Sequence, residues 1–176
     1  MIDLINSELD SHQNVLKSVK ENLTNHIYTA SILINETINQ GNKIFVFGNG
    51  NNILTTQYLV HKCHLNEKVN VFSLVQEPSI FTNIANNDGY DFIFSKQIEN
   101  LASKDDLLIG ISSSGNSKNV LRALSLGKNL GCKSIGLSGY DGGAMSEFCD
   151  LNSVIPSDNI SNIEELHMMI CNIISR

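Results

Sequence analysis

The feature that most constrains the fold is an apolar run followed by a hydroxyl-rich loop and a helical pattern, between residues 106 and 128. Residues 107–111 form an apolar run of the length that a buried parallel strand needs. The loop that follows consists of hydroxyls, one glycine and one asparagine: Ser112, Ser113, Ser114, Gly115, Asn116 and Ser117. Apolar residues then recur at helical spacing, and Ser117 stands where an N-cap is expected. This order predicts a strand, a loop and a helix.

The loop of this unit is suited to bind an anion. Free N–H groups and the positive end of the helix dipole face such a loop, and serine hydroxyls add donors without net charge. The helix start lacks Gly-Lys-Ser, so a nucleotide P-loop is a poor match. Taken alone, the loop is better explained as a serine-rich turn that caps a helix, so the prediction of a phosphate site depends on the rest of the chain.

A second unit of the same kind comes earlier in the chain. Residues 43–47 predict a buried strand, and a helix is expected from Ile53 to Leu65. The turn between them contains two glycines, which permit close approach of a ligand to the backbone: Gly48, Asn49, Gly50, Asn51 and Asn52. Further strands are expected at 69–74, 133–137 and 151–155, and helices at 80–86, 92–101 and 161–174. Ser161 and Glu164 have the spacing of a capping box.

Alternation of about five strands with helices predicts an α/β fold, a three-layer sandwich in which a five-stranded parallel sheet has helices on both faces. Ligands of such sheets bind at the carboxyl ends of the strands. Both loops, 48–52 and 112–117, follow the carboxyl ends of predicted strands. The sequence therefore predicts a small phosphorylated ligand at that edge.

The first forty residues are predicted to be helical, because apolar residues recur there at steps of three, four and seven. The pattern fits two long helices or one kinked helix, which cover the sheet or form a contact between subunits. We expect residues 1–176 to form one domain, with a helical segment at 1–40 and an α/β core at 41–176.

Composition restricts the class of partner. The chain has 176 residues, 41% of them hydrophobic and 17% charged, with a net charge of −6, which argues against binding nucleic acid or an anionic membrane. The four cysteines form no C-x-x-C pair and are expected to be reduced thiols. Neither a signal peptide nor a membrane span is expected, so the predicted location is the cytoplasm.

Five segments carry a family resemblance: GNG, ANNDGYDFIFSKQIENL, ISSSGNSKNVLRAL, GLSGYDGG and IEELHMM. Together they resemble the sugar isomerase (SIS) domain, and more narrowly the phosphoheptose isomerase family. The resemblance implies an α/β sandwich with a five-stranded parallel sheet, assembled as a homotetramer. It also implies interconversion of sedoheptulose 7-phosphate and a heptose 7-phosphate, for cell-surface heptose synthesis.

The resemblance assigns the phosphate to four serines: Ser112, Ser113, Ser114 and Ser117. It places Asn49 and Gly50 along the sugar, with Asn87 and Asp88 close by. Asn51 and Asn52, counted with these ligand-binding residues, stand where the family has a glycine and a serine.

The positions that hold zinc and move the proton in the family are all different here. A histidine and a glutamate on the helix after the first strand are replaced by Tyr58 and Lys62, and a glutamine and a histidine on the last helix by Glu164 and Asn172. Tyrosine and asparagine are not bases near pH 7, and lysine is one only if burial lowers its pKa by several units. This set does not suit zinc either, so no metal or other cofactor is expected.

Three remaining histidines have structural explanations. His61 and His64 lie on one helical face and are expected to form a surface or interface cluster, although metal ligands sometimes use this spacing. His167, in the last helix, is expected to be packed or to lie at an interface.

Three functions follow from these observations. We expect a phosphosugar-binding protein with impaired or absent isomerase chemistry. The alternatives are an active phosphoheptose isomerase and a tetrameric scaffold like the SIS proteins that bind the replication initiator. Because Lys62 and Glu164 have opposite charge, we expect them to pair where the metal would sit, within one chain or across a subunit boundary. The alternative is that Glu164 serves only the capping box while Lys62 points to solvent.

Overall fold

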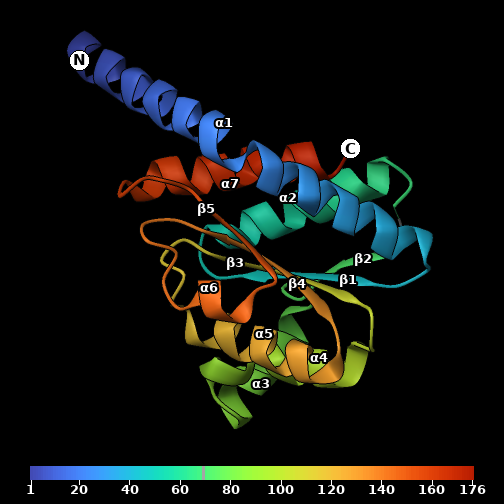
Figure 1. The fold of residues 1–176 in the computed structure, drawn as a ribbon. Helices are drawn as coiled ribbons and strands as arrows, with labels where there is room; N and C mark the ends of the chain where they lie inside the picture. Colours follow the sequence, from blue (N-terminus) through green and yellow to red (C-terminus); the bar gives the residue numbers. More distant parts are fainter. Residues whose placement is uncertain (69) are drawn as a thin grey trace.

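The computed structural model describes residues 1–68 and 70–176, and Figure 1 shows its arrangement. The strands of this part are β1 (Ile44–Gly48), β2 (Val71–Ser73), β3 (Leu107–Ser112), β4 (Lys133–Ser138) and β5 (Leu151–Val154). The helices are α1 (Ile2–Asn39), α2 (Asn52–Leu65), α3 (Pro78–Asn87), α4 (Ser95–Leu101), α5 (Lys118–Leu130), α6 (Met145–Phe148) and α7 (Ile160–Ile174). A 3-10 turn, η1, spans Tyr90–Phe92. Residue 69, where the second strand was predicted to start, lies outside the described residues.

The five strands form one parallel sheet in the order β2-β1-β3-β4-β5. In its register Ile44 pairs with Leu107, and Leu107 pairs with Lys133. Every residue of β1 and β3 is buried, as expected for central strands covered on both faces. The predicted five-stranded α/β sandwich is therefore confirmed.

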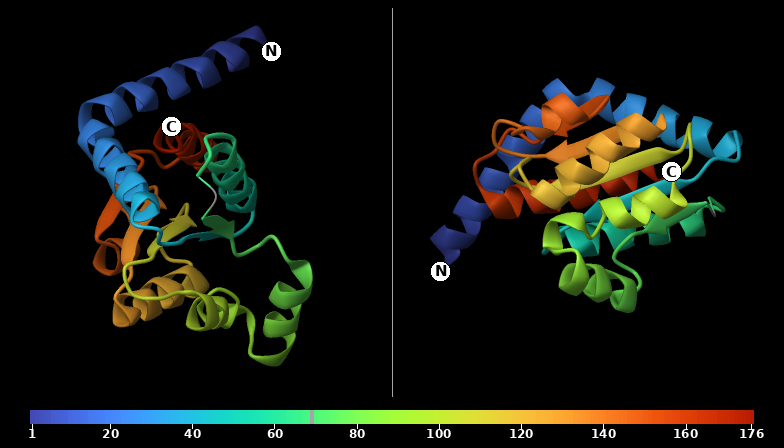
Figure 2. Two further views of the ribbon diagram at one scale, coloured as in Figure 1. Left: turned by 90° about the vertical axis from the view of Figure 1, so that its right-hand side faces the viewer. Right: turned by 90° about the horizontal axis from the view of Figure 1, so that it is seen from below.

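Helices cover both faces of the sheet (Figure 2). Helices α1, α2 and α7 lie on one face, and α4, α5 and α6 lie on the other. Each face has its own apolar core. Leu59, Ile109 and Ile170 belong to the first core, and Phe47, Phe94 and Leu124 belong to the second.

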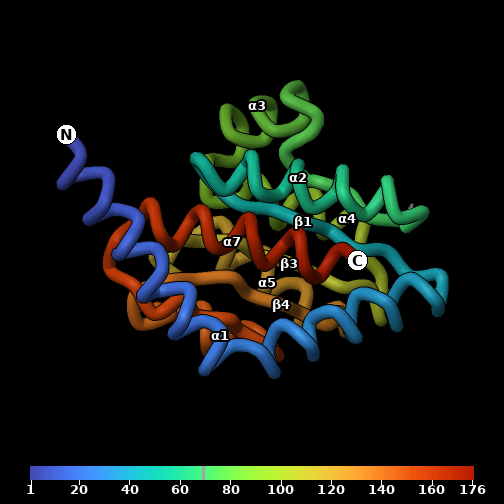
Figure 3. The backbone as a smooth tube through the Cα atoms, turned by 90° about the horizontal axis from the view of Figure 1, so that it is seen from above, coloured from blue at the N-terminus to red at the C-terminus, as the bar shows by residue number. Residues whose placement is uncertain are grey.

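The N-terminal segment is one continuous helix, α1, which bends along its length (Figure 3). Of the two predicted alternatives, the single kinked helix is confirmed. Hydroxyl groups bond back to carbonyls along α1, as in the 2.6 Å bond from Thr24 to Lys20 O, and such bonds often bend helices. The second half packs on the sheet through Ala30 and Ile34. The first half projects beyond the body (Figure 1) and exposes apolar side chains, including Leu9 at 63%.

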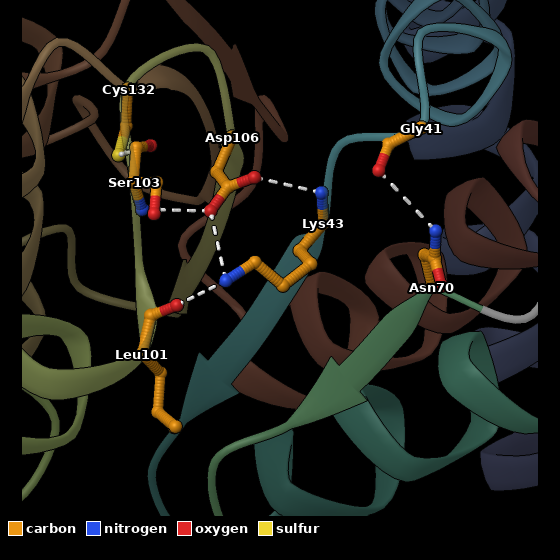
Figure 4. Close-up of polar contacts among 7 residues, drawn as sticks. All are labelled: Gly41, Lys43, Asn70, Leu101, Ser103, Asp106 and Cys132. Atoms are coloured by element: carbon orange, nitrogen blue, oxygen red, sulfur yellow. Dashed lines mark hydrogen bonds and ion pairs between the residues drawn. The ribbon is translucent and has the colours of Figure 1, made fainter.

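A buried carboxylate joins the amino ends of β1 and β3 (Figure 4). Asp106 is 2% exposed, and its two oxygens accept hydrogen bonds of 2.8 Å from the backbone N–H groups of Lys43 and Ser103. The Lys43 ammonium lies 3.6 Å from the same carboxylate. These contacts lie at the opposite edge of the sheet from the loops 48–52 and 112–117, so they support the fold rather than a ligand.

None of the helices in residues 1–68 and 70–176 combines the length and the apolar character needed to cross a membrane.

Candidate sugar-phosphate site

The candidate site lies beyond the carboxyl ends of β1 and β3, the two neighbouring central strands. The chain leaves β1 into α2 on one face of the sheet and leaves β3 into α5 on the other. In parallel sheets this change of direction opens a crevice in which ligands bind. Both predicted loops therefore meet at the place where the topology favours a ligand.

Two asparagines hold the loops together. Nδ2 of Asn49 donates to Oδ1 of Asn119 at 2.8 Å, and Nδ2 of Asn119 returns a bond of 3.0 Å to Oδ1 of Asn49. The Tyr90 hydroxyl donates to the same Asn49 oxygen at 3.1 Å. Sequence reasoning singled out neither Asn119 nor Tyr90. Nothing in the sequence around either residue indicates this role, because the burial of Asn119 in the first turn of α5 is known only from the structure.

The serine loop is ordered by its own hydroxyls. Ser112 Oγ donates to Ser117 Oγ at 2.9 Å and accepts from the Ser117 N–H at 3.3 Å. Ser114 Oγ accepts from the N–H of Asn116 at 3.2 Å. Ser117 is the N-cap residue of α5, as predicted, but its side chain bonds Ser112 rather than the helix backbone. The first turn of α5 therefore directs N–H groups toward this loop.

A second loop, at residues 139–144, packs tightly against the serine loop. Gly115 has a φ of +67°, and a Cβ placed on it would lie 2.0 Å from the carbonyl oxygen of Gly142. The N–H of Gly139 donates to Ser113 O at 2.9 Å, and that of Ala144 donates to Asn116 Oδ1 at 3.0 Å. The serine loop is consequently held in place from outside as well as from within.

A buried histidine lies behind the site. His167 is fully buried; its Nε2 donates to Ser138 O at 3.1 Å, and its Nδ1 lies 3.3 Å from Oδ1 of Asn52. Asn52 in turn donates to Ser113 Oγ at 2.9 Å. Burial lowers the pKa of His167 to about 4, although the bond to Ser138 opposes this shift. His167 is therefore packed, as predicted, and neutral at pH 7, and it reaches the serine loop through Asn52.

Glu164 faces the two loops rather than its own helix end. Its oxygens accept hydrogen bonds from Asn51 Nδ2 at 2.9 Å and from Ser113 Oγ at 3.3 Å. The predicted capping box is wrong: α7 begins one residue earlier than expected, and Asn159 caps it by accepting from the N–H of Ser161 at 2.9 Å. An asparagine at that position satisfies the helix start and leaves Glu164 available to the site.

Tyr58 and Asn172 meet between α2 and α7, where the Tyr58 hydroxyl donates to Oδ1 of Asn172 at 3.1 Å. Glu164 lies eight residues before Asn172 on α7, so it is about 12 Å away along the helix. The four substituted positions consequently form two separate groups within one chain. Lys62, one helical turn beyond Tyr58, is half-buried.

The zinc of the resembling family does not fit this donor set. Tyr58 and Asn172 bond to each other, Glu164 is held by Asn51 and Ser113, and a charged lysine cannot ligate a metal. Among residues 1–68 and 70–176, no three side chains of His, Cys, Asp or Glu gather where a metal ion could be held. Metal ligation was the alternative role considered for His64. In the structure its Nε2 lies 3.0 Å from the carbonyl oxygen of Val71 instead.

Asn87 and Asp88 lie outside this network. Both are exposed; Asn87 donates to Asn83 at 3.2 Å, and Asp88 lies 3.9 Å from the Lys96 ammonium. Their segment reaches the loops through Tyr90, which follows them in η1 and bonds Asn49.

Comparison with known proteins identifies the family and the fold of the chain. Residues 9–139 match the family described as SIS domain. The chain is 42% identical over 183 residues to a phosphoheptose isomerase of Aliarcobacter butzleri (strain RM4018), covering 99% of this chain and 97% of that protein. A phosphoheptose isomerase structure from Francisella tularensis superposes with a TM-score of 0.93 at 32% identity, covering 99% of this chain and 97% of that one. One from Neisseria gonorrhoeae superposes with a TM-score of 0.94 at 25% identity, covering 98% and 95%.

The family model matches most of the chain, and relatives of this similarity match nearly its whole length and share its fold. The chain therefore belongs to the SIS-domain family and, within it, to the phosphoheptose isomerase family.

Proposed function

We propose that this protein binds a sugar phosphate between the loops after β1 and β3, and that the metal-dependent isomerase chemistry of its family is impaired or absent. The observation that carries the second half is the hydrogen bond between Tyr58 and Asn172, two neutral groups at positions where the family uses histidines. Aldose–ketose interconversion needs a base and an acid, each worth roughly 10²–10⁴ in rate. Neither of these side chains is a base near pH 7.

Support for binding comes from the serine loop. The hydroxyls of this loop and the N–H groups in the first turn of α5, a 13-residue helix, are donors of the kind that a phosphate accepts from. Relatives named phosphoheptose isomerase make a heptose 7-phosphate the leading ligand. We further propose a homotetramer, because the exposed apolar side chains of α1 need a cover, and a cytoplasmic location, in keeping with four free cysteines.

An active phosphoheptose isomerase is the second candidate, favoured by the 42% identity to a protein of that name. A scaffold that binds a protein partner is the third candidate. Such a scaffold would not need to bind a sugar phosphate.

The discriminating experiment is turnover of sedoheptulose 7-phosphate by the purified protein, with and without added zinc, alongside a melting assay with the same ligand. We expect a raised melting temperature and no turnover under either condition. Turnover at an ordinary enzymatic rate would overturn the proposed loss of chemistry, and an unchanged melting temperature would overturn the proposed binding.

A further inference from the structure

A cavity of about 270 Å³ opens between the starts of α2 and α7, directly beside the candidate site. Its lining includes Asn51, Thr55, Glu164 and Glu165. Glu165 forms an ion pair with His12 of α1. The hydrogen-bond partners of Glu164, by contrast, are two neutral groups, Asn51 and Ser113, and no ion pair joins it to another of the described residues.

The surroundings of this cavity resemble a surface that is covered in the assembled protein. Leu54, which lines the cavity, is 60% exposed, and Ile160, at the start of α7, is 52% exposed. On the same layer of helices, the projecting half of α1 exposes Ile5 at 51%. Apolar side chains in this number usually mark an interface. Covering the cavity would remove water from Glu164, which is costly unless the covering surface brings a cation.

The lysines of α2 and its following turn differ in their partners. Lys68 donates to the carbonyls of Ser175 and Arg176 at the end of α7. Lys62 is half-buried on α2 and forms no ion pair with another of the described residues. Lys62 is therefore the lysine of α2 for which an acidic partner remains to be identified.

Lys62 cannot reach Glu164 within one chain. Helices α2 and α7 run parallel, because Asn51 bonds Glu164 near their starts and Tyr58 bonds Asn172 further along. Lys62 follows Asn51 by eleven residues, which places it about 16 Å farther along the helix axis. That separation exceeds the reach of a lysine side chain.

We propose that Lys62 of a second copy of this chain pairs with Glu164, closing the cavity at a contact between the layers formed by α1, α2 and α7. In a two-fold contact the pair forms twice, once in each direction. The second copy thus contributes a cation to the rim of the ligand site. Lys62 and Glu164 are both half-buried, carry opposite charges and lie on this layer of helices. This complementarity identifies the molecule that covers the cavity as another copy of the chain.

A charge exchange between two proteins tests this pair. Lys62→Glu and Glu164→Lys are prepared separately, and their masses in solution are measured by light scattering alone and after mixing. Each variant alone brings like charges together in both directions, so we expect each to dissociate at concentrations where wild type is assembled. The mixture unites opposite charges in both directions, so we expect it to recover the wild-type mass.

Controls separate a lost pair from a lost fold. Lys128→Glu on the opposite face of the sheet is expected to assemble like wild type. Glu164→Gln keeps one acceptor oxygen for Asn51 or Ser113 and removes the charge, and we expect it to melt cooperatively and to dissociate at lower dilution than wild type. A wild-type monomer, a mixture no larger than its components, or variants that assemble normally alone would overturn the proposal. All measurements are made without sugar phosphate, so their outcome is independent of ligand binding and of turnover.

Discussion

The Tyr58 hydroxyl donates a 3.1 Å hydrogen bond to Oδ1 of Asn172, so this bond joins α2 and α7 at two positions that the family resemblance assigns to histidines. Both side chains are half-buried, and the bond belongs to the packing between these helices. This contact gives these two substituted positions a structural role that needs no metal.

We expect Tyr58→Phe to lower the free energy of unfolding by about 1 kcal/mol, the usual net contribution of one such bond. The shift in melting temperature caused by a sugar phosphate should stay as in wild type, because Tyr58 lies about two helical turns from the loop residues. Chemical denaturation and a melting assay measure both quantities. A lost ligand response with normal stability would assign Tyr58 to the ligand instead.

Restoring the family residues should restore metal binding. In the variant Tyr58→His, Lys62→Glu, Glu164→Gln and Asn172→His, we expect zinc to raise the melting temperature, because imidazole and carboxylate are ligands that zinc prefers. Wild type should show no such shift. Calorimetric titration with zinc compares the two proteins, and equal zinc affinity in both would contradict the interpretation.

The serine loop should determine phosphate binding. We expect Ser114→Ala combined with Ser117→Ala to abolish the stabilisation by sugar phosphate, because two hydroxyl donors at the start of α5 are removed. Ser125→Ala, on the same helix but away from the loop, is the matched control. A double variant that still responds like wild type would exclude this loop as the site.

His167 should make the protein sensitive to acid. Its pKa is lowered to about 4 by burial, so between pH 6.5 and 4 the unfolded chain binds a proton that the folded chain does not. Wild type therefore loses stability relative to His167→Gln as pH falls through this window, by about 3 kcal/mol in total, at 1.36 kcal/mol per pKa unit. Urea denaturation at several pH values tests this, and parallel curves for both proteins would refute it.

His12 should act in the opposite direction. Its pKa is raised, first by a hydrogen bond to the Glu8 carbonyl and then by Glu165, so its contribution is complete below about pH 6.5 and is lost as pH rises through the folded pKa. The His12 side chain is 33% exposed and that of Glu165 is 64% exposed, so water screens the pair. His12→Gln should therefore lower the free energy of unfolding by less than about 1 kcal/mol at pH 5.5, and by a smaller amount still at pH 9. Equal losses at both pH values would show that protonation of His12 is irrelevant.

Much of the fold could be predicted from the sequence, because strand and helix periods are local. Apolar runs predicted the five strands, and the positions of β1 and β3 placed the loops 48–52 and 112–117 together. The prediction of the capping box was wrong, because two nearby polar side chains could each cap the same helix. Asn159 and Ser161 were both able to cap α7, and the backbone selected Asn159, which left Glu164 to bond Asn51 and Ser113.

The network around the site was beyond sequence reasoning for a related reason. Asn119 and Tyr90 contact Asn49 across 70 and 41 residues, and nothing in the local pattern of either residue indicates such a partner. His167 was expected to be packed, but its link to Ser113 through Asn52 required the orientation of α7 against α2.

The close approach of Gly115 to Gly142 limits how this protein can change over time. A single added methyl group in the serine loop would require the 139–144 loop to retreat, and that loop cannot retreat without losing its bonds to Ser113 and Asn116. A side chain at position 115 is therefore tolerated only together with a matching change in the 139–144 loop. A change of shape at this point of the loop must therefore proceed through paired replacements, which are rarer than single ones.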